Sequence, residues 1–241
     1  MRTSARLLSQ VAHCVREAVA VGVTPLELDA LTEREIRRRG ARPAFKGYDV
    51  GGAVFPASLC ASRNEQVVHG IPDDRPLLEG DLISLDFGLE HEGYFADMAF
   101  TVVLGPMPER VRKLLDVTRE ALYTAASCAV PGARVGDIGH RVQATVEAEG
   151  FGVVRQYVGH GIGRNLHEEP SVPNYGKAGT GALLKPGMCI AIEPMVTMGG
   201  WRCRTLGDRW TVVTADGSLA AHFEHTVLVT EHGPEILTES S

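Results

Sequence analysis

The chain has 241 residues, of which 44% are hydrophobic, so it can bury a sizeable core as one large domain or as two fused halves. Its 24 Lys and Arg residues against 30 Asp and Glu residues give a formal net charge of -6 without long runs of like charge, which disfavours nucleic-acid binding. The apolar stretches are too short for a membrane span, and charged residues interrupt the N-terminal segment, so neither a membrane anchor nor a signal peptide is predicted.

The cysteines indicate the compartment in which the protein works. They are odd in number and form no CxxC pair, which fits a reducing compartment and argues against a disulfide framework or a thiolate zinc site. We therefore expect a cytoplasmic protein with five free cysteines, which are Cys14, Cys60, Cys128, Cys189 and Cys203.

The N-terminal part of the chain predicts two helices in succession. Apolar residues at helical spacing indicate a helix over residues 4–20. Thr24, Pro25 and Glu27 then supply an N-cap, a proline at the first helical position and a capping-box glutamate. A second helix is therefore expected to start at this point and to run to Gly40.

The same order of elements then recurs along the chain. A β-rich stretch over residues 53–103, broken by a loop at 70–74, is followed by two further predicted helices, over about 108–130 and 135–149, and by another β-rich stretch to Thr238. This order predicts an α+β fold of two similar halves, about 1–106 and 107–241, each a helix pair followed by antiparallel strands. The absence of any linker-like stretch favours a single compact domain over residues 1–241.

An unusual pair of acidic residues lies within residues 81–103. Asp86 and Asp97 each interrupt a run of strand formers, and the polar bend around His91 and Glu92 predicts a hairpin turn between them. With the turn centred on these two residues, antiparallel pairing places Asp86 directly opposite Asp97. Like charges in that position are destabilising, so the pair needs a shared proton or, more favourably, a divalent cation. The alternatives are that one aspartate points to solvent or that a one-residue shift splits the pair.

Four further segments place polar residues in apolar surroundings. His69 follows a short predicted strand, where a lone histidine is more often structural. His160 lies among three glycines and is followed by His167, and a merely flexible glycine loop would not explain two histidines. Glu193 and Glu224 each interrupt an apolar strand, although carboxylates are rarely buried without a partner. The candidate cluster is then Asp86, Asp97, His160, Glu193 and Glu224.

The composition of this cluster indicates a chemistry. Four buried carboxylates carry about the charge that two divalent cations neutralise, and bridging carboxylates hold paired metals in hydrolytic sites. An oxygen-rich set suits Mn²⁺, Fe²⁺ or Co²⁺, with Zn²⁺ also compatible. His69 and His167 would be free to hold a substrate or to stabilise an oxyanion. The residues alone thus predict hydrolysis of an amide.

Several motifs resemble those of one known family. The segments HGIPDD, SLDFG, GHGIGR and EPM, in this order, resemble the type I methionine aminopeptidases over about residues 4–238. The resemblance implies the pita-bread fold of that family, with two pseudo-symmetric halves around a central antiparallel sheet. It also implies a task, the removal of the initiator methionine from nascent proteins whose second residue is small.

The resemblance assigns a role to each residue of the cluster. It implies that Asp86 chelates one of two metals, that Asp97 and Glu224 bridge both, and that His160 and Glu193 complete the shell of the second. Glu193 would also take the proton from the attacking water.

The resemblance further implies a substrate pocket. His69 would contact the scissile amide nitrogen and His167 would polarise the scissile carbonyl. The methionine side chain would lie among Phe55, Cys60, Leu166 and Trp210, with His222 and Phe223 nearby. Leu166 stands where relatives commonly carry phenylalanine, which affects the shape of the pocket.

Other partners and functions are less favoured by the sequence. No exposed heptad or large apolar stripe demands a partner chain, so a monomer is expected, and ribosome association is compatible with the task although no basic patch indicates it. One alternative is a proline-specific relative, an aminopeptidase P or prolidase, but these carry a further N-terminal domain for which the chain leaves no room. A non-enzymatic module with the same fold is the other alternative, and the intact ligand set argues against it.

Overall fold

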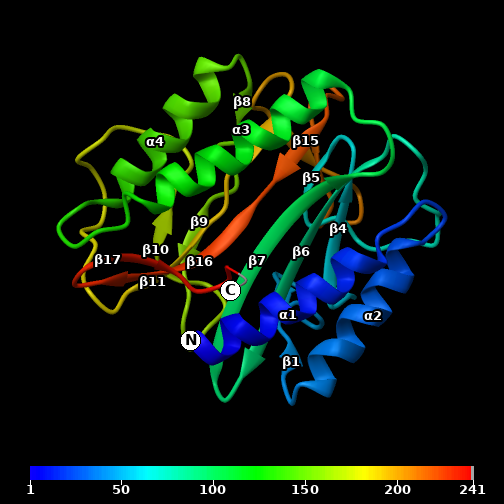
Figure 1. Cartoon of the computed structure of the whole chain (residues 1–241), viewed down its shortest axis with the longest axis horizontal. Coiled ribbons are helices and arrows are strands. Elements are labelled where there is room, and N and C mark those ends of the chain that lie inside the picture. The colour runs from blue at the N-terminus through cyan, green and yellow to red at the C-terminus, as the bar shows by residue number, and fades with distance from the viewer. Residues whose placement is uncertain (240–241) are drawn as a thin grey trace.

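The structure is a computed structural model that describes residues 1–239 (Figure 1). Its helices agree with the four predicted ones to within a few residues at each end. They are α1 (Arg2–Ala18), α2 (Pro25–Arg38), α3 (Glu109–Ala126) and α4 (Val135–Ala148).

Most strands occupy the two stretches that the sequence marks as β-rich. Those that precede α3 are β1 (Arg42–Pro43), β2 (Asp49–Val50), β3 (Ala53–Val54), β4 (Leu59–Arg63), β5 (Gln66–Val68), β6 (Leu82–His91) and β7 (Tyr94–Val103). Of these, β1 and β2 lie before residue 53, where no strand was predicted. Those that follow α4 are β8 (Gly152–Val153), β9 (Gly159–Gly161), β10 (Glu168–Val172), β11 (Cys189–Ile192), β12 (Met195–Thr197), β13 (Cys203–Thr205), β14 (Val212–Thr214), β15 (Ala220–His222), β16 (Glu224–Thr230) and β17 (Gly233–Ile236).

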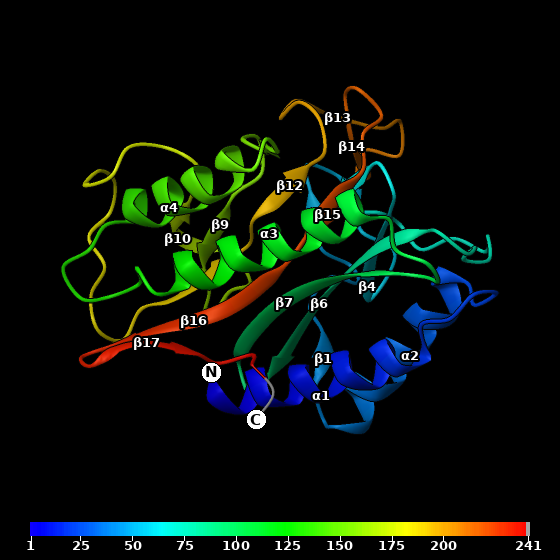
Figure 2. The same ribbon diagram turned by 45° about the horizontal axis from the view of Figure 1, so that its top comes forward.

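A large antiparallel sheet joins strands from both stretches. Its path runs β1-β6-β7-β16-β11-β9-β10, with β4 added to β6 and β17 added to β16. Figure 1 shows α1 and α2 over one part of this sheet and α3 and α4 over the other, on the same face, and Figure 2 shows the same layers from a second angle. This is the α+β architecture with a central antiparallel sheet that the sequence predicts, and β7 and β16 meet at its centre.

The ends of α2 and α4 follow local sequence signals. The side chains of Thr24 and Glu27 form the predicted capping box, each bonding the backbone N–H of the other. After each of these helices a glycine takes positive φ, 71° at Gly40 and 75° at Gly150. Only glycine adopts this conformation at low cost, so the two helix pairs end alike.

The hairpin of β6 and β7 differs from the prediction in its register. The turn residues are Glu92 and Gly93, with φ of 53° and 78°, which is the two-residue geometry that favours glycine. Asp86 therefore pairs with Ala99, so the predicted direct pairing of Asp86 with Asp97 is wrong. Moving the turn centre by one residue shifts the partner by two, so both aspartates stay on the same face of the sheet.

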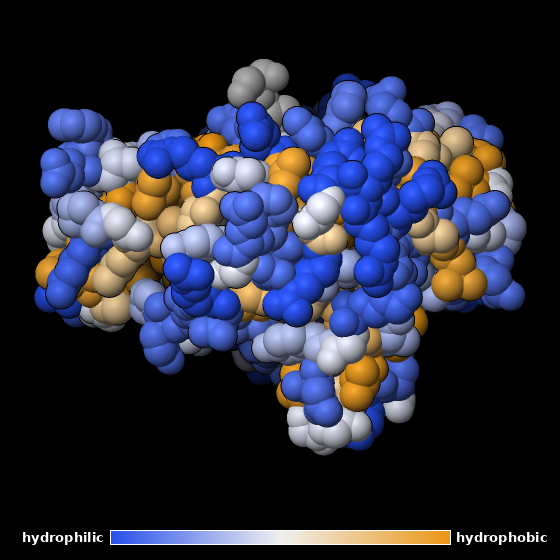
Figure 3. Space-filling model, turned by 90° about the horizontal axis from the view of Figure 1, so that it is seen from below, coloured by the Kyte–Doolittle hydropathy of each residue, from blue (hydrophilic) through white to orange (hydrophobic). Residues whose placement is uncertain are grey.

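The core lies between the helices and the sheet. Phe87 and Phe100 stack there with ring centroids 5.4 Å apart, and both are almost fully buried. The outer surface seen in Figure 3 is mostly hydrophilic, with hydrophobic side chains in small separate groups. Within residues 1–239, no helix combines the length and the apolar character needed to cross a membrane.

Candidate metal centre and active site

Three carboxylates lie side by side on neighbouring strands of the central sheet. Asp86 on β6 and Glu224 on β16 both pair with Ala99 of β7, from its two sides. Asp97 lies two residues before Ala99, and residues two apart along a strand point to the same face. All three side chains therefore project from the face opposite the helices, at the place where the strands of the two β-rich stretches meet.

The remaining predicted ligands come from the second stretch of strands. His160 lies in the middle of β9, and Glu193 directly follows β11. Nε2 of His160 is 3.9 Å from Oδ2 of Asp97 and 3.7 Å from Oε1 of Glu193. Donor atoms of Asp97, His160 and Glu224 all lie within 4.8 Å of one another, which is close enough for one metal ion to reach them together.

The glycines around His160 have a structural reason. A Cβ atom at Gly159 would lie 2.3 Å from the carbonyl oxygen of Ala191, and one at Gly161 would lie 2.3 Å from that of Glu169. The neighbouring strands β11 and β10 thus approach β9 so closely that only glycine fits. The need for glycine at positions 159 and 161 is therefore explained by the close approach of the neighbouring strands.

The carboxylates of this cluster are buried without enough partners. Asp86, Asp97, Glu193 and Glu224 are at most 9% exposed. One oxygen each of Asp86, Asp97 and Glu224 has no hydrogen-bond partner, and neither has Nε2 of His222, which lies 3.8 Å from Oε2 of Glu224. Leaving such atoms unpaired costs free energy, so the cluster needs a compensating cation or bound protons.

The acid–base properties of the cluster reflect this shortage. Burial raises the pKa of Asp86 to about 7. Burial and the charge of Asp86 raise the pKa values of Asp97 and Glu193 well above their usual range, and burial and the charge of Asp97 do the same for Glu224. Divalent cations would remove this penalty, and the donor set of four carboxylates and an imidazole fits hard or borderline metals.

The predicted catalytic histidines, His69 and His167, border the same cavity as this cluster. His69 follows β5 with a positive φ of 58°, and burial lowers its pKa to about 4. The rings of His160 and His167 are 4.3 Å apart between centroids. Nδ1 of His167 lies 2.7 Å from the hydroxyl oxygen of Tyr48, a residue that the sequence analysis did not single out.

The cluster and the histidines open into one cavity of about 190 Å³. Its apolar wall includes all four residues predicted for the methionine pocket, with the rings of Phe55 and Trp210 5.1 Å apart. Phe45, Tyr48, Val50 and Val68 also line the cavity. A signal for the first three existed in the aromatic and glycine residues of the segment 45–52, which includes β2 and the turn of the short β2–β3 hairpin. The apolar lining is Phe45, Val50, Phe55, Cys60, Val68, Leu166 and Trp210.

Of the two residues expected near this pocket, one lies on the other face of the sheet. Phe223 borders a different cavity on the helix-covered face, so its predicted place near the methionine pocket is wrong. The reason is the alternation of side chains along a strand, because Phe223 adjoins Glu224 and points to the opposite face. His222 is buried beside the carboxylates, 3.9 Å from Oε2 of Glu193, so it lies near the pocket as expected, although it does not itself line the 190 Å³ cavity.

The chain matches known proteins over nearly its whole length. The family model described as metallopeptidase family M24 matches residues 1–231. A methionine aminopeptidase 1 of Bacillus subtilis is 47% identical over 238 residues, covering 99% of this chain and 94% of the relative. A methionine aminopeptidase of Clostridium acetobutylicum is 49% identical over 239 residues, covering 99% and 94%.

The fold agrees with the same relatives. The crystal structure of a methionine aminopeptidase from Thermotoga maritima superimposes with a TM-score of 0.96 at 44% identity, covering 100% of this chain and 95% of the other. This likeness confirms the pita-bread fold. The chain therefore belongs to metallopeptidase family M24 and, within it, to the methionine aminopeptidases.

Proposed function

We propose that the protein removes N-terminal methionine from nascent polypeptides whose second residue is small, with two divalent cations held by the carboxylate cluster. The observation that carries the proposal is the set of buried, under-paired carboxylate oxygens at the end of a cavity with an apolar wall. The restriction to a small second residue rests on the likeness to the relatives. Because nascent chains are made in the cytoplasm, the proposed activity is cytoplasmic.

The number of cations follows from charge. The four carboxylates bring up to four negative charges into a buried space, and two divalent cations would balance them. The ligands would be Asp86, Asp97, His160, Glu193 and Glu224, with Asp97 and Glu224 shared between the cations. When bound, such cations supply Lewis acidity and lower the pKa of a bound water to near neutrality. The donor chemistry suits Mn²⁺, Fe²⁺ and Co²⁺, with Zn²⁺ also compatible.

The histidines would bind the substrate as neutral groups. Burial lowers the pKa of His167, so its imidazole is neutral near pH 7. In this proposal the Tyr48 hydroxyl, 2.7 Å from Nδ1, is the donor, which leaves the proton of the ring on Nε2. His167 would then donate from Nε2 to the scissile carbonyl oxygen as negative charge develops on it. His69, which borders the same cavity, would contact the scissile amide nitrogen.

Glu193 is proposed to move the proton. It is buried within the cluster, and its Oε1 lies 3.7 Å from Nε2 of His160. A carboxylate in this place can accept the proton of the attacking water and return it to the departing amine. The side chain of methionine would lie against Phe55, Cys60, Leu166 and Trp210, where the polarisable thioether suits an aromatic and sulfur-containing wall.

The test compares two peptides and four metals. The metal-free protein is titrated in turn with Mn²⁺, Fe²⁺, Co²⁺ and Zn²⁺, and hydrolysis of Met-Ala-Ser is measured against that of Gly-Pro-Ala. Cleavage after methionine only, saturating near two equivalents of metal, is expected. Saturation at one equivalent would contradict the paired cations, preference for the proline peptide would favour a prolidase-like activity, and no cleavage with any metal would favour a binding module.

A further inference from the structure

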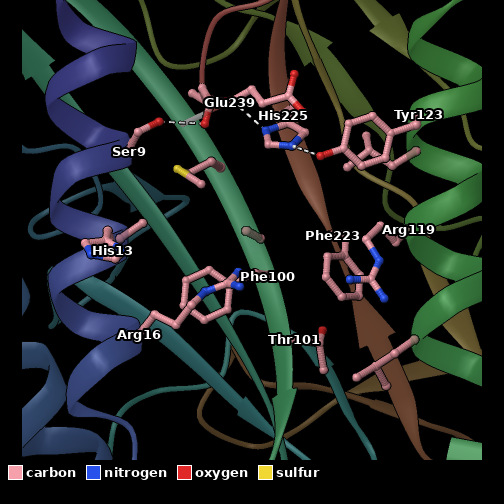
Figure 4. Close-up of a pocket in the computed structure, with 16 residues that line it drawn as sticks. Ser9, His13, Arg16, Phe100, Thr101, Arg119, Tyr123, Phe223, His225 and Glu239 are labelled. Atoms are coloured by element: carbon pink, nitrogen blue, oxygen red, sulfur yellow. Dashed lines mark hydrogen bonds between the residues drawn. The ribbon is translucent and has the colours of Figure 1, made fainter. Parts of the chain in front are cut away.

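A second cavity lies on the face of the sheet that the helices cover. It has a volume of about 400 Å³, and its walls are α1 and α3 (Figure 4). The strands β7 and β16 form its floor. We call it the α1–α3 groove, and the residues on which its chemistry depends are Arg16, Phe100, Arg119, Tyr123, Phe223 and His225.

The groove lies back to back with the candidate metal centre. Phe223 and His225 border the groove and flank Glu224, whose side chain points through to the other face. Met98 borders the groove in the same way and directly follows Asp97. One layer of sheet therefore separates the two cavities, and the groove is not part of the proposed methionine pocket.

One end of the groove is closed by hydrogen bonds within the chain. The Tyr123 hydroxyl lies 3.4 Å from Nε2 of His225, and Nδ1 of His225 lies 2.8 Å from Oγ1 of Thr238 (Figure 4). Glu239 also borders this end and supplies a carboxylate. The groups at this end mostly satisfy one another, and the negative charge disfavours an anion there.

The other end of the groove is positively charged. Arg16 extends from α1 over the ring of Phe100, with its guanidinium carbon 4.1 Å from the ring centroid. Arg119 extends from α3 toward Phe223, with its guanidinium carbon 5.9 Å from the ring centroid. In Figure 4 the two arginines extend from opposite walls of the groove. Arg119 pairs with Asp116 of its own helix at 2.6 Å. Within residues 1–239, no carboxylate forms an ion pair with Arg16.

Both guanidinium groups border the same groove, one from each of the helices that form its walls. Partial burial, followed by the charge of Arg119, lowers the pKa of Arg16. Contact with an aromatic ring occupies a face of the guanidinium group and leaves its N–H edges available. These edges match the oxygen spacing of a phosphate, to which arginine binds with two parallel hydrogen bonds. A dianionic group between the arginines would relieve their repulsion.

We propose that the α1–α3 groove binds a small organic phosphate, with the phosphate group between Arg16 and Arg119. A cavity of about 400 Å³ lies in the range of small-molecule sites, about 300 to 1,000 Å³, and exceeds what a bare oxyanion needs. Met98, Leu115 and Leu122 give the groove an apolar wall for the organic part. The carboxylate of Glu239 at the closed end favours the orientation with the phosphate toward the arginines.

The test measures binding to the metal-loaded protein by calorimetry, with phenyl phosphate, inorganic phosphate and sodium chloride at equal ionic strength. The variants are Arg16→Gln and Arg119→Gln. Arg112→Gln, an exposed change on α3 outside the groove, is the matched control. Peptidase activity and the melting temperature of each variant report whether it is folded.

Phenyl phosphate should bind more tightly than inorganic phosphate, and each groove variant should weaken it by about tenfold or more, as expected for losing a hydrogen bond to a charged group. Arg112→Gln should bind like the wild type. Binding that is the same in all variants would place the phosphate at the metal centre and overturn the proposal. Binding no tighter than chloride would also overturn it, and equal affinity for inorganic and phenyl phosphate would overturn the assignment of an organic ligand.

Discussion

The hydroxyl oxygen of Tyr48 lies 2.7 Å from Nδ1 of His167, although the two residues are 119 positions apart in the chain. Tyr48 belongs to the loop before β2, and His167 directly precedes β10. Their contact brings the segment before β2 against the start of β10, in the wall of the proposed active site. A hydrogen bond in this position fixes both the orientation of the imidazole and the nitrogen that carries its proton.

We predict that Tyr48→Phe lowers kcat by about 3- to 10-fold, the usual effect of losing one neutral hydrogen bond, with little change in KM. The freed Nδ1 would accept a proton more readily, so the pKa of His167 should rise and the acidic limb of the rate profile should move to higher pH. Tyr175→Phe, outside the 190 Å³ cavity, is the control. A change in KM alone would show that Tyr48 only contacts the substrate.

His167→Ala tests the role of the imidazole itself. If His167 donates a hydrogen bond to the developing oxyanion, its removal should cost about 10²- to 10³-fold in kcat. The bound metal, measured by elemental analysis, should stay at the wild-type level because His167 lies beside His160 and is not among the proposed ligands. A parallel loss of metal and activity would place His167 in the ligand shell.

The candidate cluster was accessible to prediction because its residues violate a local pattern. Asp86, Asp97, Glu193 and Glu224 each interrupt an apolar strand, and a buried carboxylate without a partner is unfavourable. The structure brings all four to one cavity with His160. The predicted register of the β6–β7 hairpin was wrong for a physical reason. The turn forms at the two residues that adopt positive φ, Glu92 and Gly93, so its centre lies one residue further along the chain than predicted.

The features that escaped prediction depend on contacts between distant segments. Tyr48 gives no local sign of its contact with His167. The α1–α3 groove combines Arg16 and Arg119, which are ordinary solvent-facing residues in the sequence of each helix. The face of the sheet to which Phe223 points was predictable from its alternation with Glu224. The widths of the two cavities, by contrast, depend on side-chain packing across the whole sheet.

Asp97→Asn tests the cluster while conserving its shape. The change removes one proposed shared ligand, so we expect turnover to fall below detection and the bound metal to fall with it. The metal-free variant should be at least as stable as the metal-free wild type, because a buried carboxylate with an unpaired oxygen is replaced by a neutral group. Wild-type turnover with unchanged metal content would contradict the proposed role.

The buried carboxylates also predict how the stability of the metal-free protein depends on pH. Their pKa values are raised in the folded state, to about 7 for Asp86 from an ordinary value of 3.8, so the folded protein binds more protons than the unfolded chain. Under this condition the free energy of unfolding falls as the pH rises. Buried histidines act oppositely, since the lowered pKa values of His69 and His160, about 4, add stability as the pH rises toward 6.5.

Above about pH 7.5 these histidines are largely neutral in both states, and the carboxylates dominate. We therefore expect the melting temperature of the metal-free protein to fall between about pH 7.5 and 8.5, and to fall less steeply in Asp86→Asn. In the presence of Mn²⁺ the trend should reverse, because metal and protons compete for the same oxygens and the metal binds better as protons leave. A melting temperature of the metal-free protein that rises over this range would show that the carboxylates are already ionised, and that another group compensates their charge.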